Sequence, residues 1–195
     1  MTGNKAAPKV LMLLGSPRKK GNSAILAEQI ARGARSAGAT VESVYLHGLT
    51  IAPCRACYAC QKPRSRGCAV DDDMQALYPK LIEAGAWVIA SPVYWFTLSA
   101  QTKLFMDRCF ALLAYASNPF AGKRIAIAMT YGDTDPVTSG CINALRTFQD
   151  AFAYTKSPIV GMVYGSAPGP GDIRKNEALL REAEALGRTL VAPGP

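Results

Sequence analysis

Five short apolar segments, separated by segments with helical periodicity, constrain the fold of this chain more than any other feature. They cover residues 9–14, 40–46, 86–91, 124–130 and 157–164. Each is continuously apolar rather than alternating, which predicts strands that are buried on both faces. The second is the most polar, as an edge strand is expected to be. The alternation of strands and helices predicts an α/β fold in which helices cover both faces of a parallel sheet.

Helices are expected between these strands, because apolar residues recur there at helical spacing, as at Leu26, Ile30 and Ala34. Four of them have residues that can cap the first turn. The expected caps are Asn22 or Ser23, Asp72 or Asp73, Ser99, and Thr138 or Ser139. The length of 195 residues suits one domain spanning residues 1–195, with loosely held tails at 1–8 and 192–195.

The formal charge of +8 favours an anionic small ligand over nucleic acid. The basic residues gather in two expected loops rather than along one helix, and no zinc finger, basic zipper or RNA-binding motif accompanies them. These loops contain Arg18, Lys19 and Lys20, and then Arg55, Lys62, Arg64 and Arg66. The N-terminus does not resemble a signal peptide and no apolar segment is long enough to span a membrane, so we expect a cytoplasmic protein.

The loop after the first strand has the composition of a phosphate-binding site. In a parallel sheet, ligands bind beyond the carboxyl ends of the strands. The sequence "GSPRKKGNSAILAEQI" provides side-chain donors from Ser16, Asn22 and Ser23, and Arg18 adds a charged, planar fork. It lacks the glycine patterns of a Rossmann dinucleotide site and of a P-loop. An ordinary capped turn is the alternative interpretation.

Aromatic and polar residues follow the third and fourth strands. Tyr94, Trp95 and Phe96 are consecutive in "SPVYWFTLSAQTKLFMDR", and three adjacent aromatic rings cannot all point into one core. At least one should be available to a flat ligand. Tyr131 and Gly132 lie in "TYGDTD" after the fourth strand, where a plain turn is an equally good interpretation.

Together these loops resemble those of the flavodoxin-like NAD(P)H-dependent FMN reductases, over nearly the whole chain. The signatures are "GSPRKKGNS", "SPVYWFTLSAQTKLFMDR" and the "DDDM" at 71–74. The resemblance implies a three-layer sandwich with a five-stranded parallel sheet in the order 2-1-3-4-5. It also implies that FMN binds at these loops. The matching residues are Ser16, Arg18, Asn22 and Ser23 for the phosphate, Pro92, Val93, Tyr94, Trp95 and Phe96 beside the ribityl chain and ring, and Thr130, Tyr131, Gly132 and Asp133 over the ring.

The expected activity is the oxidation of NAD(P)H through FMN, followed by transfer of electrons to an acceptor. No catalytic acid or base is expected, because the redox chemistry belongs to the flavin. Arg64 and Arg66 are the candidates for favouring NADPH over NADH, through the extra phosphate of NADPH. The alternatives are a flavodoxin-like electron carrier without its own substrate and, ranked lower, a flavin-binding regulatory protein. The resemblance and the aromatic run at 94–96 also predict a homodimer or a tetramer of dimers.

Four of the six cysteines lie in "PCRACYACQKPRSRGC", residues 53–68, which we call the cysteine segment. Within the family it resembles the iron–sulfur flavoproteins. Three cysteines at two-residue intervals plus a more remote fourth also suit a [4Fe–4S] cluster held by Cys54, Cys57, Cys60 and Cys68. Such a cluster would pass single electrons between FMN and a partner. Zinc and an inert loop remain alternatives, and disulfides rank last in a reducing compartment.

The remaining chemistry-bearing residues have simpler interpretations. The only histidine, His47, follows the second strand and is expected to be a loop residue. Cys109 and Cys141 are expected to be buried and inert. The spacing of Lys103 and Asp107 predicts a surface ion pair.

Overall fold

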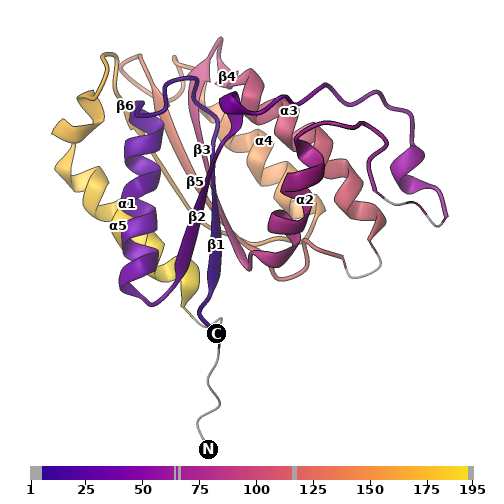
Figure 1. Cartoon of the computed structure of the whole chain (residues 1–195). Coiled ribbons are helices and arrows are strands. Elements are labelled where there is room, and N and C mark those ends of the chain that lie inside the picture. Colours follow the sequence, from indigo (N-terminus) through magenta and orange to yellow (C-terminus); the bar gives the residue numbers. More distant parts are fainter. Residues whose placement is uncertain (1–5, 64, 66, 116–117, 193–195) are drawn as a thin grey trace, which may run out of the picture.

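The computed structural model describes residues 6–63, 65, 67–115 and 118–192, and a parallel sheet forms its centre (Figure 1). Its long strands are β1 (Lys9–Leu14), β2 (Thr40–Tyr45), β3 (Ala86–Tyr94), β5 (Arg124–Tyr131) and β6 (Ile159–Ser166). They pair in parallel in the order β2-β1-β3-β5-β6, which confirms the predicted order, with the most polar strand at one edge. A two-residue strand that the sequence did not predict, β4 (Thr97–Leu98), pairs antiparallel with the end of β3.

Helices cover both faces of the sheet (Figure 1). One face carries α1 (Asn22–Ser36) and α5 (Glu177–Val191), and the other carries α2 (Met74–Glu83), α3 (Ala100–Arg108) and α4 (Cys141–Tyr154). The short 3₁₀ helices are η1 (Leu46–Gly48), η2 (Ala59–Gln61), η3 (Cys109–Ala114) and η4 (Asp172–Lys175). None of the described helices is both long and apolar enough to cross a membrane.

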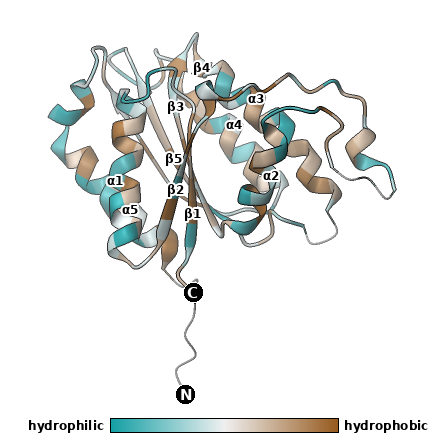
Figure 2. Ribbon diagram, in the orientation of Figure 1, coloured by the Kyte–Doolittle hydropathy of each residue, from teal (hydrophilic) through white to brown (hydrophobic). Residues whose placement is uncertain are grey.

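The sheet has an apolar core on each face, because successive side chains of a strand point to opposite faces. In β3, Trp87 and Ile89 pack with the α2, α3 and α4 side, whereas Val88 and Ala90 pack with α1 and α5. Figure 2 shows the matching pattern on the helices, whose hydrophobic residues face the sheet. Two-sided burial therefore explains the continuous apolar runs of the sequence.

The helix caps differ in part from the sequence expectation. The Ser99 side chain accepts a hydrogen bond from the Thr102 N–H at 3.3 Å, which confirms that cap. The carboxylate of Asp72 accepts from the Met74 N–H at 3.0 Å at the start of α2. By contrast, α1 has Gly21 at its N-cap and no side-chain cap, because the Asn22 carboxamide binds another loop.

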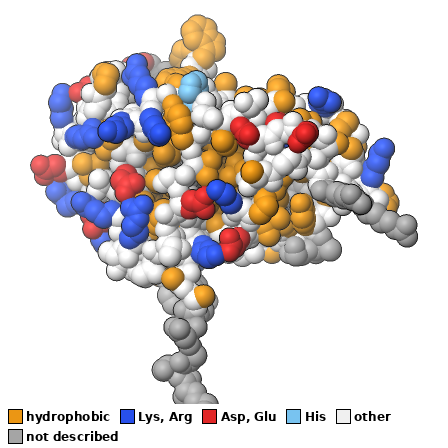
Figure 3. All heavy atoms as spheres, viewed as in Figure 1, with side chains coloured by type: hydrophobic (Ala, Val, Ile, Leu, Met, Phe, Trp, Pro, Cys, Tyr) orange, Lys and Arg blue, Asp and Glu red, His pale blue; other side chains and the backbone are white. Residues whose placement is uncertain are grey.

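The charged surface shows no single basic stripe. In Figure 3, Lys and Arg side chains gather mainly on the side of the molecule where α1 lies, and Asp and Glu side chains lie among them. Ion pairs lie on the surfaces of the two helices of this face, as between Arg35 and Glu28 in α1 and between Arg188 and Glu184 in α5. Part of the basic surface is therefore paired with acidic side chains.

Candidate functional site

The loops after β1, β3 and β5 meet at the carboxyl edge of the sheet. The Gly15 N–H donates to the carbonyl of Ala90 in β3 at 2.8 Å. The buried Ser99 hydroxyl, at the start of α3, donates to the Gly15 carbonyl at 2.7 Å. The first and third loops are therefore held together by hydrogen bonds as well as by the sheet.

The first loop presents an exposed cation beside a helix start. Ser16 is buried, and its hydroxyl accepts a hydrogen bond from the Arg18 backbone N–H at 3.0 Å. The Arg18 side chain is exposed, and it makes no hydrogen bond or ion pair with any described residue. Ser23 is buried in the first turn of α1. The backbone N–H groups at such a helix start favour an anion, and Arg18 adds a positive charge beside them.

Asn22 has a role that the sequence did not reveal. Its side-chain Nδ2 donates to the carbonyls of Ala167 at 3.1 Å and Gly169 at 2.8 Å. The carboxamide therefore ties the first loop to the segment that follows β6. Because both amide protons are used, the backbone N–H of Asn22 is the donor left for a phosphate. No local pattern in the sequence indicated that the loop after β6 belongs to this edge.

The third loop is a tight hairpin that carries exposed aromatic rings. The side chains of Tyr94, Trp95 and Phe96 are all exposed, and Trp95 reaches 91%. Trp95 and Phe96 both have left-handed backbone, with φ of 48° and 66°. Bulky residues rarely adopt this conformation, which costs on the order of 1–2 kcal/mol each. Strain of this kind is typical of binding sites.

The start of α4 holds the hairpin in this strained form. Gly140 has φ of 75°, and a Cβ added there would lie 2.5 Å from the Cα of Phe96. The Asn143 side chain donates to the Phe96 carbonyl at 3.1 Å. The hairpin therefore packs directly on the backbone of α4, and only glycine fits at the contact.

The fourth loop divides into buried and exposed parts. Thr130 and Tyr131 are buried at the end of β5, whereas Gly132 and Asp133 are exposed. The Tyr131 carbonyl accepts a hydrogen bond from the Ala167 N–H at 2.7 Å, and burial raises the pKa of the Tyr131 phenol. Gly132 and Asp133 are therefore the parts of this loop open to a ligand.

The cysteine segment extends away from these loops along α3. Cys54 and Cys57 are exposed, Cys68 is half-buried and Cys60 is buried. Two of the sulfurs accept hydrogen bonds, Cys60 Sγ from Gln61 Nε2 at 3.3 Å and Cys68 Sγ from Arg108 Nη2 at 3.4 Å. All four cysteines line a mainly apolar cavity of about 460 Å³ whose other walls include Trp87, Phe105, Phe120 and Phe152.

The described cysteines do not converge as a metal site. Their chemistry suits iron or zinc, because thiolates bind both. However, within the part of the chain that the structure describes, no three Cys, His, Asp or Glu side chains form a group able to hold a metal ion. The segment in this conformation therefore does not fit a [4Fe–4S] cluster.

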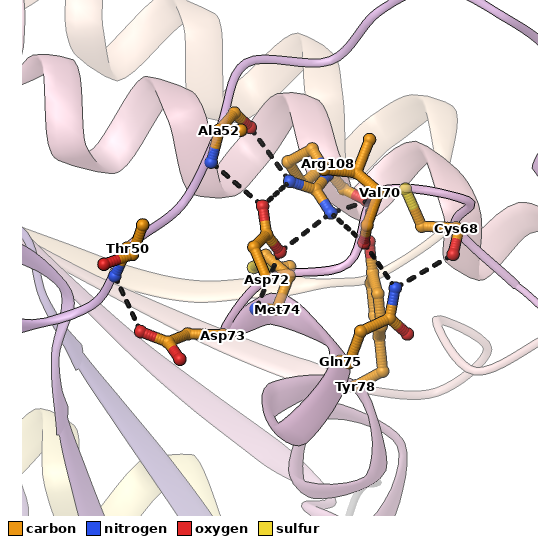
Figure 4. Close-up of polar contacts among 10 residues, drawn as sticks. All are labelled: Thr50, Ala52, Cys68, Val70, Asp72, Asp73, Met74, Gln75, Tyr78 and Arg108. Carbon is orange, nitrogen blue, oxygen red and sulfur yellow. Dashed lines mark hydrogen bonds and ion pairs between the residues drawn. The ribbon is translucent and has the colours of Figure 1, made fainter.

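A buried ion pair between Asp72 and Arg108 lies at the base of the cysteine segment (Figure 4). The Arg108 side chain is fully buried and that of Asp72 is 5% exposed. Burial alone would raise the pKa of Asp72, but hydrogen bonds from Arg108 and from two backbone N–H groups outweigh it and hold this pKa below its ordinary value. The sequence predicted Asp72 as a possible helix cap within the "DDDM" signature, and nothing in it indicated the pairing with the last residue of α3.

The other singled-out residues lie where the sequence predicted. His47 is exposed, and its Nδ1 pairs with the Gln101 side chain at 3.1 Å. Cys109 and Cys141 are buried, and burial raises the pKa of both thiols, to about 11 for Cys141. Lys103 and Asp107 form the expected exposed ion pair at 2.7 Å. Arg64 and Arg66, the candidates for an NADPH preference, lie outside the described residues.

Comparison with known proteins agrees with this arrangement. Residues 8–169 match the family model "NADPH-dependent FMN reductase". An iron–sulfur flavoprotein of Archaeoglobus fulgidus is 36% identical over 123 residues, which span 63% of this chain and 61% of that protein. The putative NAD(P)H-dependent FMN-containing oxidoreductase YwqN of Bacillus subtilis is 26% identical over 91% of this chain and 96% of its own.

Among solved structures, the NAD(P)H:quinone oxidoreductase from Methanothermobacter marburgensis superposes with a TM-score of 0.75. The identity is 19%, and the match covers 97% of this chain and 99% of that one, so it bears on the fold alone. The family match spans most of the chain, including all three loops at the sheet edge and the cysteine segment. The chain therefore belongs to the NADPH-dependent FMN reductase family, beside the iron–sulfur flavoproteins, and it is an oxidoreductase with a flavodoxin-like fold.

Proposed function

We propose that the chain binds FMN at the carboxyl edge of the sheet and uses it to oxidise NAD(P)H. The observation that carries this proposal is that two features lie in loops at the same edge of the sheet: an exposed arginine with no partner among the described residues, and a strained aromatic hairpin. Arg18 and the start of α1 suit a phosphate, and the hairpin at 94–96 suits a flat ring system. These are the two chemically distinct ends of FMN.

Each part of the edge has a separate task in this proposal. Arg18 and the first-turn N–H groups of α1, including that of Ser23, bind the phosphate. Pro92, Val93 and the hairpin would border the ribityl chain and the ring, and Gly132 and Asp133 would close over the ring. When bound, FMN supplies the redox chemistry by accepting the electron pair of the nicotinamide. The protein orients the two ring systems and excludes water between them.

We also propose that a second copy of the chain covers the aromatic hairpin. Trp95 is almost fully exposed, and Val137 and Ile142, which flank Gly140, are 73% and 43% exposed. Exposed apolar side chains of this kind favour association between proteins. Sedimentation of the FMN-bound protein tests this: a dimer or tetramer at tens of micromolar is expected, and a monomer alone would contradict it.

The [4Fe–4S] cluster is a further proposal, and it requires a change in the cysteine segment. Because no three potential metal ligands among the described residues form a group able to hold a metal ion, the thiols would have to come closer together. The compact spacing and the donors that already contact Cys60 Sγ and Cys68 Sγ support a thiolate site. Anaerobic purification with iron and sulfide analysis is the test, with Cys57→Ser as the variant. Wild-type protein without iron or sulfide would remove the cluster and leave the FMN proposal intact.

An FMN titration with two matched variants of the first loop tests the binding site. Arg18→Ala removes the unpaired guanidinium and should weaken FMN binding by ~1.5–3 kcal/mol, since a charge-assisted phosphate contact is lost. Lys20→Ala removes an exposed charge from the same loop without removing that contact, and it should change the affinity less than about threefold. Equal effects of the two variants would show that general charge, not a built phosphate site, attracts the ligand.

A further inference from the structure

Helix α3 connects the flavin loops to the cysteine segment. At its N-terminal end, the Ser99 hydroxyl donates to the Gly15 carbonyl in the first loop. Its last residue, nine positions later, is Arg108 at the base of the cysteine segment. A helix of this length spans about 14 Å. The two ends of one rigid element therefore contact the two chemically distinctive parts of the chain.

The guanidinium of Arg108 binds both ends of the cysteine segment (Figure 4). Nη1 donates to the carbonyl of Ala52, which immediately precedes the segment, at 2.9 Å. Nη2 donates to Cys68 Sγ, at the end of the segment, and to the Val70 carbonyl, both at 3.4 Å. A single buried group thus closes a loop of sixteen residues that contains four thiols.

Asp72 completes the connection from the other side. Its carboxylate accepts from Nη1 and Nη2 of Arg108, from the Ala52 N–H at 2.9 Å and from the Met74 N–H at 3.0 Å. Next to it, Asp73 accepts from the Thr50 N–H at 2.7 Å. Arg108 and Asp72 come from two of the three signature stretches: Arg108 is the last residue of "SPVYWFTLSAQTKLFMDR", and Asp72 lies in "DDDM".

We propose that Arg108 is a positioning residue that fixes the cysteine segment, and Cys68 Sγ within it, relative to the flavin loops through α3. The inference rests on the proposed function only for the thiolate site that the segment is proposed to hold. Only arginine has the planar fork that reaches Ala52 on one side and Cys68 on the other while pairing with a carboxylate. Lysine keeps the charge but cannot make these contacts together.

Hydrogen–deuterium exchange on the full chain, with and without FMN, tests the role of Arg108. In Arg108→Lys, amides at residues 50–74 should exchange about tenfold faster or more, because both anchors of the segment are weakened. Exchange in peptides from β1 and α1 should be unchanged.

Iodoacetamide should modify Cys68 faster in Arg108→Lys than in the wild type, while the buried Cys141 stays protected. FMN affinity should stay within about twofold. Lys103→Gln, which breaks an exposed ion pair on the same helix, is the control and should leave all these measurements at the wild-type values.

The exchange pattern separates this inference from the proposed function. Arg108→Lys with wild-type exchange at 50–74 would overturn the positioning role, and so would acceleration spread equally over β1 and α1. If the wild-type chain binds no FMN, but Arg108→Lys still speeds exchange only at residues 50–74, the flavin proposal is refuted and the role of Arg108 is supported. If Arg108→Lys does not fold, the wild type decides: the Ala52 and Met74 amides should be as protected as those of β1, and fast exchange there would refute the inference.

Discussion

Gly140→Ala should separate the hairpin from α4 and lower both stability and FMN affinity. Gly140 has φ of 75°, and an added Cβ would lie 2.5 Å from Phe96 Cα and 2.6 Å from the Phe96 carbonyl oxygen. The left-handed backbone costs alanine about 1–2 kcal/mol, and a clash with backbone that must shift adds about 1–3 kcal/mol. The stiffer unfolded chain returns a few tenths to 1 kcal/mol. We therefore expect a net loss of about 2–4 kcal/mol, measured by urea denaturation.

A matched glycine isolates the clash from the backbone strain. Gly38 has a similar φ of 88°, but nothing lies within 4 Å of an added Cβ. Gly38→Ala should therefore cost only about 1 kcal/mol and leave FMN binding unchanged. Because Phe96 is displaced only in Gly140→Ala, that variant alone should bind FMN more weakly. Equal stability losses and equal FMN affinities in the two variants would refute the contact between α4 and the hairpin.

Three other changes have expected outcomes. Trp95→Asn should leave the stability of the fold unchanged or slightly raised, because asparagine tolerates left-handed backbone and the ring is exposed. The same change should weaken FMN binding by about 0.5–1.5 kcal/mol, measured by fluorescence titration. An unchanged FMN affinity would exclude the Trp95 ring from the site. Asp72→Asn leaves a buried guanidinium without its anion and should cost about 3–5 kcal/mol in urea denaturation. Burial lowers the pKa of Lys123 from 10.5 to about 8, so between these values the unfolded chain binds more protons and the contribution of Lys123 to stability rises with pH. Stability curves from pH 7 to pH 10 should show this rise, and Lys123→Met should remove it.

The fold could be predicted from the sequence because its signal is local. The strands are continuous apolar runs, and their burial on both faces, as at Trp87 and Val88 in β3, requires helices on each side. The handedness of parallel connections then leaves few strand orders, and the resemblance to the FMN reductases selected the order 2-1-3-4-5 among them. The structure adds β4, which the sequence did not signal, since it consists of two residues held by pairing with β3 rather than by any apolar pattern.

The site could be predicted only as far as residue type and strand position allow. Arg18 and the aromatic hairpin follow from loops placed at strand ends. By contrast, the Asn22 side chain bonds to residues more than 140 positions away, and Asp72 pairs with a residue 36 positions away. Such long-range contacts depend on how α1, α3 and the loop after β6 meet, which no local pattern encodes. The cysteine spacing predicts thiolate chemistry, but it does not fix how the backbone of the segment folds between Ala52 and Cys68.

Anaerobic mixing of the FMN-loaded protein with NADPH, and separately with NADH, tests the central claim most directly. Visible absorbance should report flavin bound at the sheet edge, and one equivalent of at least one nucleotide should bleach it within the time of mixing. A protein that binds FMN but is bleached by neither nucleotide would instead be an electron carrier. A protein that binds no FMN at micromolar concentration would contradict the account entirely.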